Sequence, residues 1–118
     1  MKEARSPGTT DVLGLLGLAQ RAGQLTVGVE ITRKALSAGE VRLVLLAEDA
    51  SPRQIERVRV LAGHRGVPVA GLRSQDMLGR ALGKGPVSAV GVTGRSFARR
   101  LLDLLPSTRS GSSDGKKT

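Results

Sequence analysis

The feature that most constrains the fold is an uninterrupted apolar segment, Leu43–Ala47 (LVLLA), near the middle of the chain. A strand that is apolar on both faces has to be covered on both sides, which is typical of α/β proteins. A helix start follows closely: Ser51 is a suitable N-cap, Pro52 suits the first helical position, and Gln54 completes a capping-box pattern. We therefore expect a sheet with helices packed against both faces.

Helix and strand signals alternate along the rest of the chain. They predict helices at 11–22, 28–38, 51–65, 74–82 and 96–105, and strands at 25–27, 43–47, 67–69 and 87–92. Asp11 is the expected N-cap of the first helix, and the expected helix stops are Gly23, Gly39 and Gly66. This order predicts a three-layer α/β/α sandwich around a small mixed four-stranded sheet.

The same patterns predict which side chains face the core. In the second helix these are Ile31, Ala35 and Leu36. In the third helix the predicted apolar face consists of Ile55, Val58, Val60, Leu61 and Ala62.

Composition separates both ends of the chain from this domain. Residues 1–10 are polar and contain Pro7 and Gly8, so we expect a disordered lead-in. Residues 106–118 are rich in Ser, Gly and Lys and cannot bury a core, so we expect a flexible basic tail. The folded domain is therefore predicted at 11–105.

The chain is strongly basic. Its 118 residues include 19 Lys and Arg against 10 Asp and Glu, which gives a formal net charge of +9. An excess of this size is typical of proteins that bind an anionic partner, either nucleic acid or a membrane surface. We favour nucleic acid over the simpler interpretation that the charge only keeps the protein in solution.

Several protein classes are disfavoured by what the chain lacks. It has no cysteine, which excludes disulfides, thiol catalysis and cysteine-based zinc sites. The longest apolar stretch, 41–47, is interrupted by Arg42 and is far shorter than a bilayer span. The N-terminus has no apolar segment typical of a signal peptide. We expect a cytoplasmic monomer with no membrane contact.

Few groups could perform catalysis. His64 is the only histidine, and its place near a helix end favours contact with terminal carbonyls over metal binding. Glu48 and Asp49 follow the buried strand, where α/β proteins place ligands, but they also fit a turn. Residues 79–85 (GRALGKG) resemble a phosphate loop but lack its spacing and its Ser or Thr. We expect no enzymatic activity, metal or cofactor; an enzyme using Glu48 and Asp49 is the last-ranked alternative.

Basic residues lie beside glycine-rich turns, where the backbone can approach a phosphate closely. Arg33 and Lys34 belong to the second predicted helix, while Arg80 and Lys84 flank the end of the fourth. The basic residues of the third helix are instead expected to form a solvated face: Arg53, Arg57, Arg59 and Arg65. Phe97 is the only aromatic residue and has a core position, so we expect recognition of structured RNA by phosphates and shape, without base stacking.

Several segments, taken in order, resemble the kink-turn-binding ribosomal protein family, the group of the archaeal L7Ae and eukaryotic L30e proteins. These segments are 28–36 (GVEITRKAL), Gly39, 42–52 (RLVLLAEDASP), 67–68 (VP) and 78–84 (LGRALGK). The opening 13–23 (LGLLGLAQRAG) is similar to a bacterial, YlxQ-like branch. The resemblance covers nearly all of 11–105 and implies an α/β/α sandwich, RNA binding and a ribosome-related setting.

The resemblance also implies where RNA binds: the start of the second helix, the loop before the last strand, and the turn after the buried strand. Together with the basic residues beside the turns, the predicted RNA-binding residues are Gly28, Glu30, Ile31, Arg33, Lys34, Glu48, Asp49, Arg80, Lys84, Gly85, Pro86, Val87 and Ser88.

The start of the second helix departs from the family pattern. Kink-turn binders of this family carry Asn-Glu there, and those side chains read sheared G·A pairs. Here the two places hold Glu30, which can accept but not donate a hydrogen bond, and Ile31, which can do neither. We therefore expect phosphate contacts, plausibly with ribosomal RNA, and weak sequence readout. The alternative is a protein-interaction module in translation or ribosome assembly, contacting the ribosome or translation factors without strong RNA binding.

Overall fold

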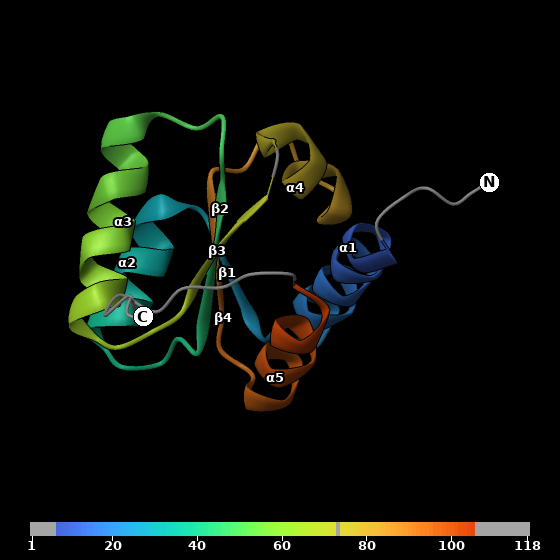
Figure 1. Ribbon diagram of the computed structural model, residues 1–118, viewed down its shortest axis with the longest axis horizontal. Helices are drawn as coiled ribbons and strands as arrows, with labels where there is room; N and C mark the ends of the chain where they lie inside the picture. Colours follow the sequence, from blue (N-terminus) through green and yellow to red (C-terminus); the bar gives the residue numbers. More distant parts are fainter. Residues whose placement is uncertain (1–6, 73, 106–118) are drawn as a thin grey trace, which may run out of the picture.

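A mixed sheet divides the molecule into two helical layers, as the computed structural model shows for residues 7–72 and 74–105 (Figure 1). Its strands are β1 (Leu25–Val27), β2 (Leu43–Ala47), β3 (Val69–Leu72) and β4 (Ala89–Val92), in the spatial order β1-β4-β2-β3. β2 and β3 are parallel, whereas β4 runs antiparallel to both β1 and β2. The predicted four-stranded mixed sheet is confirmed.

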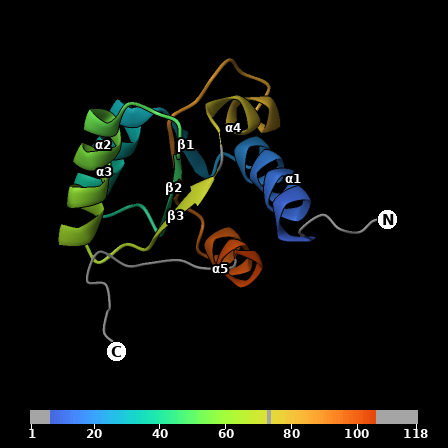
Figure 2. The same cartoon turned by 45° about the horizontal axis from the view of Figure 1, so that its top comes forward.

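Helices cover both faces of this sheet (Figures 1 and 2). The bounds are α1 (Pro7–Arg21), α2 (Val29–Ser37), α3 (Pro52–His64), α4 (Gln75–Ala81) and α5 (Arg95–Leu104). α2 and α3 pack together on one face, and α1, α4 and α5 lie on the other. The predicted three-layer α/β/α sandwich is therefore confirmed.

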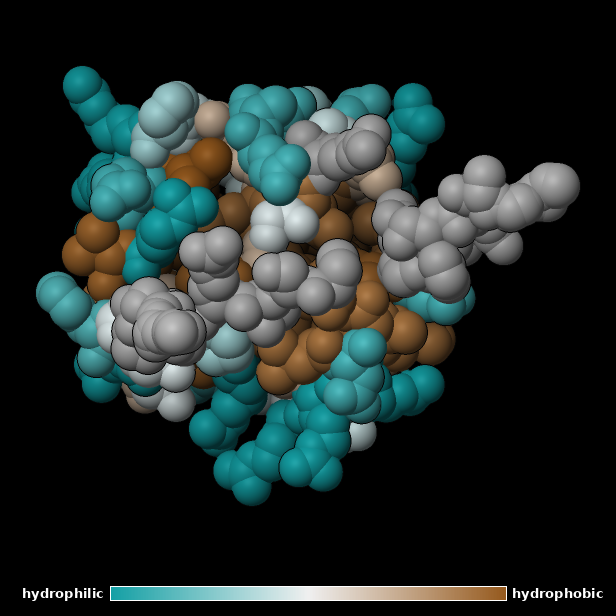
Figure 3. Space-filling model, in the orientation of Figure 1, coloured by the Kyte–Doolittle hydropathy of each residue, from teal (hydrophilic) through white to brown (hydrophobic). Residues whose placement is uncertain are grey.

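β2 is the centre of the core, and all five of its residues are buried. Because side chains alternate along a strand, Leu43 and Leu45 pack toward α1, α4 and α5, while Val44 and Leu46 pack toward α2 and α3. Burying one such leucine stabilises the fold by roughly 1.5–3 kcal/mol. In the space-filling view, apolar residues gather between the helical layers and hydrophilic side chains project around the rim (Figure 3).

The order of helices and strands in the described residues agrees with the prediction, but several boundaries differ. α1 begins at Pro7, so residues 7–10 belong to a helix and Asp11 is not its N-cap. Proline suits the first position of a helix, which explains the earlier start. The last strand begins at Ala89, two residues later than predicted, and α5 begins at Arg95, one residue earlier. Residues 1–6 and 106–118, predicted to be a disordered lead-in and a flexible tail, lie outside the described residues.

The predicted glycine stops are confirmed: Gly23, Gly39 and Gly66 all have positive φ after a helix. The predicted capping box is wrong, because Ser51 makes no side-chain cap hydrogen bond. Pro52 has no backbone N–H, so the first turn of α3 has one unpaired donor fewer to satisfy.

Two side chains predicted to face the core are exposed instead. Ile31 is 56% exposed and Val60 is 46% exposed. The buried face of α2 consists of Thr32, Ala35 and Leu36, which are spaced three and four residues apart as on one face of a helix. Ile31 is one residue before this series and therefore lies outside the buried face. No helix in the described part of the chain is long and apolar enough to cross a membrane.

Candidate nucleic-acid interface

The sheet register brings three of the predicted RNA-binding segments to one end of the molecule. β1 and β2 both run antiparallel to β4, so they end where β4 begins. The Gly28 N–H donates to the carbonyl of Ala89 (2.9 Å), and the Ala47 N–H donates to the carbonyl of Ser88 (2.9 Å). The start of α2, the turn at 48–49 and the loop at 84–88 are therefore neighbours, which no local sequence pattern established.

The N-terminus of α2 is open. Gly28 is its N-cap, with φ 112° and ψ 155°, a conformation that only glycine adopts without strain. No side chain forms a cap hydrogen bond there. The first-turn N–H groups and the positive end of the helix dipole therefore face this end of the molecule without a side-chain acceptor. Glu30, Ile31 and Lys34 are exposed on the same helix.

A pair of hydrogen-bonded threonines, one buried and one half-buried, fixes the position of α2. Thr32 is fully buried, and its Oγ1 lies 2.9 Å from the Oγ1 of Thr26 in β1. The Gly91 N–H of β4 donates to the same Thr26 oxygen (3.1 Å). A Cβ at Gly91 would lie 2.6 Å from that oxygen, so the contact requires glycine there. Sequence reasoning missed these residues, because Thr26 and Gly91 are 65 positions apart.

Gln75 links the turn after β2 to the loop before β4. Its backbone N–H donates to Asp49 Oδ1 (2.8 Å), and its side-chain amide donates to the Asp49 carbonyl (3.3 Å). The Ser88 hydroxyl donates to Gln75 Oε1 (3.0 Å), and the Val87 N–H donates to the Gln75 carbonyl (3.1 Å). One carboxylate oxygen of Asp49 therefore accepts a bond from the start of α4, so Asp49 supports the loop structurally. Gln75 was not predicted, since its partners are distant in sequence.

The loop at 84–88 also packs tightly against α4. The Lys84 N–H donates to the Gly79 carbonyl (2.8 Å), and a Cβ at Gly79 would lie only 2.0 Å from the Gly85 carbonyl oxygen. Lys84, Gly85 and Pro86 are exposed. Val87 is 6% exposed and belongs to the core, so its side chain anchors the loop and does not face a partner.

The charged members of the predicted site differ in their partners. Arg33 Nη1 lies 2.9 Å from Glu30 Oε1, and Arg80 Nη2 lies 3.5 Å from Asp76 Oδ2. Exposed ion pairs of this kind contribute roughly 0–1 kcal/mol, and each leaves the other N–H donors of its arginine available to a phosphate. The Glu48 side chain lies over Gly71 of β3, where a Cβ would come within 2.8 Å of its Oε2. Gln75 is the first residue of α4, and Arg80 is close to its last residue. Arg80 therefore lies away from the centre of the candidate interface.

The residues considered for catalysis are not brought together. His64 is exposed and is the last residue of α3, whereas Glu48 and Asp49 precede that helix. Among the described residues, no group of three or more His, Cys, Asp and Glu side chains is placed to hold a metal ion.

Comparison with known proteins shows the family to which the chain belongs. Residues 10–101 match the model of the ribosomal protein L7Ae/L30e/S12e/Gadd45 family. The chain belongs to this family, and the predicted similarity to its YlxQ-like bacterial branch is confirmed. It is 37% identical over 91 residues to the RNA-binding protein YlxQ of Bacillus subtilis, an alignment that covers 77% of this chain and 91% of that one.

Two other similar proteins broaden the comparison. The large ribosomal subunit protein eL8 of Haloquadratum walsbyi is 38% identical over 74 residues, which cover 62% of each chain. A solved structure described as a protein with unknown function from Bacillus halodurans C is 38% identical, with a TM-score of 0.77 and coverage of 81% of this chain and 97% of that one.

Proposed function

We propose that this protein binds structured RNA, ribosomal RNA foremost, through backbone phosphates and without catalysing a reaction on it. The observation that carries the proposal is the open N-terminus of α2 beside the exposed loop at 84–86, which contains Lys84 and Gly85. Helix N-termini bind phosphate through free N–H groups and the helix dipole. Lys84 supplies positive charge in the loop beside this helix start, and Lys34 supplies it in the last turn of α2.

The similar proteins support an RNA partner. The Bacillus subtilis relative is named an RNA-binding protein, and the Haloquadratum walsbyi relative is a protein of the large ribosomal subunit. The net charge of +9 favours the same kind of partner. Glu30 is paired with Arg33, which reduces the electrostatic cost of placing its carboxylate near phosphates.

Filter binding of large-subunit ribosomal RNA across a series of salt concentrations tests the proposal. Each phosphate contact adds about one unit to the slope of log affinity against log salt, so the wild-type slope is expected to be steep. Lys34→Ala removes one contact, so we expect the slope to fall by about one unit, similarly for several RNAs. A flat salt response contradicts the proposal, and a loss confined to one RNA would indicate base readout.

A protein-interaction module in translation or ribosome assembly is the second candidate. The exposed Ile31 at the start of α2 favours it, because an apolar side chain there suits a protein partner better than a phosphate. Protein purified without nuclease treatment distinguishes the two candidates. Co-purifying RNA, seen as excess absorbance at 260 nm, supports the first, and its absence together with a flat salt response supports the second.

A further inference from the structure

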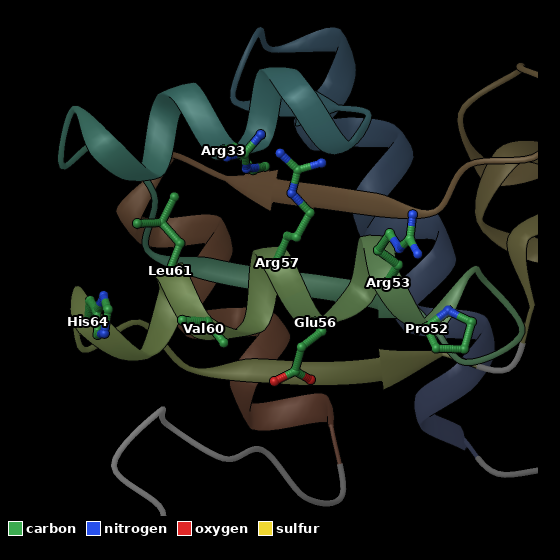
Figure 4. Close-up of a pocket in the computed structure, with 8 residues that line it drawn as sticks. All are labelled: Arg33, Pro52, Arg53, Glu56, Arg57, Val60, Leu61 and His64. Carbon is green, nitrogen blue, oxygen red and sulfur yellow. The ribbon is translucent and has the colours of Figure 1, made fainter.

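An open groove runs along the seam between α2 and α3, on the outer surface of that helical layer. It has a volume of about 770 Å³. Its lining includes Arg33 of α2 and Arg53, Arg57, Val60 and Leu61 of α3 (Figure 4). We call it the α2–α3 groove. The basic residues of α3, expected from the sequence to form an unspecialised solvated face, are therefore partly gathered in one depression.

Three arginines form a row in this groove. Arg53 and Arg57 are one helical turn apart in α3, and both side chains point toward α2 (Figure 4). The guanidinium group of Arg57 points toward Arg33 of α2 (Figure 4). Cations held close together repel one another, and an anion between them removes that cost. The row therefore favours an anionic occupant.

The acidic residues nearby leave most of this charge uncompensated. Glu56 points away from the row (Figure 4), and its carboxylate lies 3.8 Å from Arg59. Within the described ranges, no ion pair joins Arg53 or Arg57 to a carboxylate. Arg33 contacts Glu30 through Nη1. A guanidinium has five N–H donors, so the others stay available to a second acceptor.

The row continues from the proposed RNA interface. α2 and α3 both begin at the end of the sheet where β1 and β2 end. Arg53 lies in the first turn of α3, and Arg33 and Arg57 lie in the second turns of their helices. A polyanion bound at the open start of α2 therefore needs to continue only one or two turns to reach all three arginines.

We propose that the α2–α3 groove binds the backbone phosphates of the same RNA where it extends beyond the start of α2. This inference rests on the proposed function and extends the proposed RNA interface to a second helix, α3. Planar guanidinium groups fit phosphate oxygens with paired hydrogen bonds, which suits arginine better than lysine here. Continuity with the proposed interface and the row of three arginines favour RNA over an acidic protein.

The test compares two charge-matched variants on two RNA probes. Arg53→Gln with Arg57→Gln removes two charges from the groove, and Arg99→Gln with Arg100→Gln removes two exposed charges from α5 in the opposite helical layer. The probes are a long structured fragment of large-subunit ribosomal RNA and short fragments made from it by partial hydrolysis. Thermal unfolding of each variant establishes that it is folded.

We expect the groove variant to bind the long fragment roughly tenfold more weakly, with a salt slope lower by about two units, and the α5 variant to change little. The short fragments should show a smaller loss, because they fill the start of α2 without reaching the groove. Equal behaviour of the two variants on the long fragment overturns the inference, and an acidic protein is then the remaining occupant of the groove. If Lys34→Ala also has no effect, the proposed function itself fails.

Discussion

Two strand-to-helix junctions lie at the same end of this molecule, and they are built in opposite ways. The start of α2 has a glycine N-cap with φ 112° and no side-chain acceptor. The start of α4 is closed: Ser74 Oγ accepts from the Met77 N–H (3.0 Å), and Asp49 Oδ1 accepts from the Gln75 N–H (2.8 Å). The helix N-terminus that lacks protein acceptors is available to an external anion, and the satisfied one is not.

The difference separates the junction that supports the loop at 84–88 from the junction that belongs to the proposed RNA interface. The acceptors at α4 hold the loop at 84–88 in place through Gln75, so the closed junction positions residues that lie beside the open one. Sequence alone did not separate these roles, because Asp49 and Gly28 were both predicted to contact RNA. Substitutions at the two junctions should therefore have different effects on binding and on stability.

The largest effect is expected from Gly28→Ala at the open junction. A Cβ at Gly28 meets no atom within 4 Å, so the change acts only by straining a backbone conformation that alanine disfavours. We expect the free energy of unfolding to fall by about 1–3 kcal/mol. RNA affinity should fall roughly tenfold, because relief of the strain moves the first turn of α2. Chemical denaturation and filter binding measure the two quantities.

Gly14→Ala is the matched control for that change. Gly14 lies in α1, and a Cβ there also meets nothing within 4 Å. Alanine in a helix should stabilise this protein by roughly 0.5–1 kcal/mol, with RNA affinity unchanged. Similar losses in both variants would show that the open junction has no special role.

A second change at the open junction should increase the specificity of the protein for a kink-turn RNA. Replacing Glu30 by Asn and Ile31 by Glu restores the pair that kink-turn binders of the family carry at these places. We expect affinity for a kink-turn RNA to rise roughly tenfold, since a well-placed base contact contributes about 1–3 kcal/mol of discrimination. Affinity for a duplex of equal length should stay the same. An equal rise for both RNAs would mean that the gain does not come from base readout.

The smallest effect on RNA is expected at the closed junction. Asp49→Ala removes the acceptor for the Gln75 N–H, so the free energy of unfolding should fall by about 0.5–1.5 kcal/mol. Ser74→Ala removes the cap of α4 and should cost about 1 kcal/mol. Neither change removes a phosphate contact, so the salt slope of RNA binding should be unaltered. A lower slope for Asp49→Ala would contradict the assignment of that carboxylate to support.

Most of the fold could be predicted from local patterns. The buried strand at 43–47, the glycine stops and the Ser74 cap each depend on neighbouring residues, and the structure confirms them. Errors arose where the local pattern was ambiguous. Ile31 and Thr32 are adjacent, and whether the apolar or the polar residue faces inward was decided by a partner, Thr26, in another element.

The site was predicted less completely, because its geometry depends on contacts between distant segments. Family resemblance indicated the start of α2 and the loop at 84–88, but Gln75 joins that loop to the turn after β2 through partners 13 and 26 positions away. Val87 was assigned to the interface by its place in that loop, although its side chain is buried. The arginine row also escaped prediction, since the Arg57 side chain points toward Arg33 only because α2 and α3 pack together (Figure 4).

The central position of β4 has a consequence for how the protein is made. β4 lies between β1 and β2, and among the described strands it leaves the ribosome last, because chains are synthesised from the N-terminus. Until residues 88–92 have emerged, the N–H groups of Gly28 and Ala47 lack their acceptors, and the start of α2 is not joined to the turn after β2. Long-range pairing of this kind forms late in folding. The proposed RNA interface therefore assembles only after β4 has been synthesised and has paired with β1 and β2.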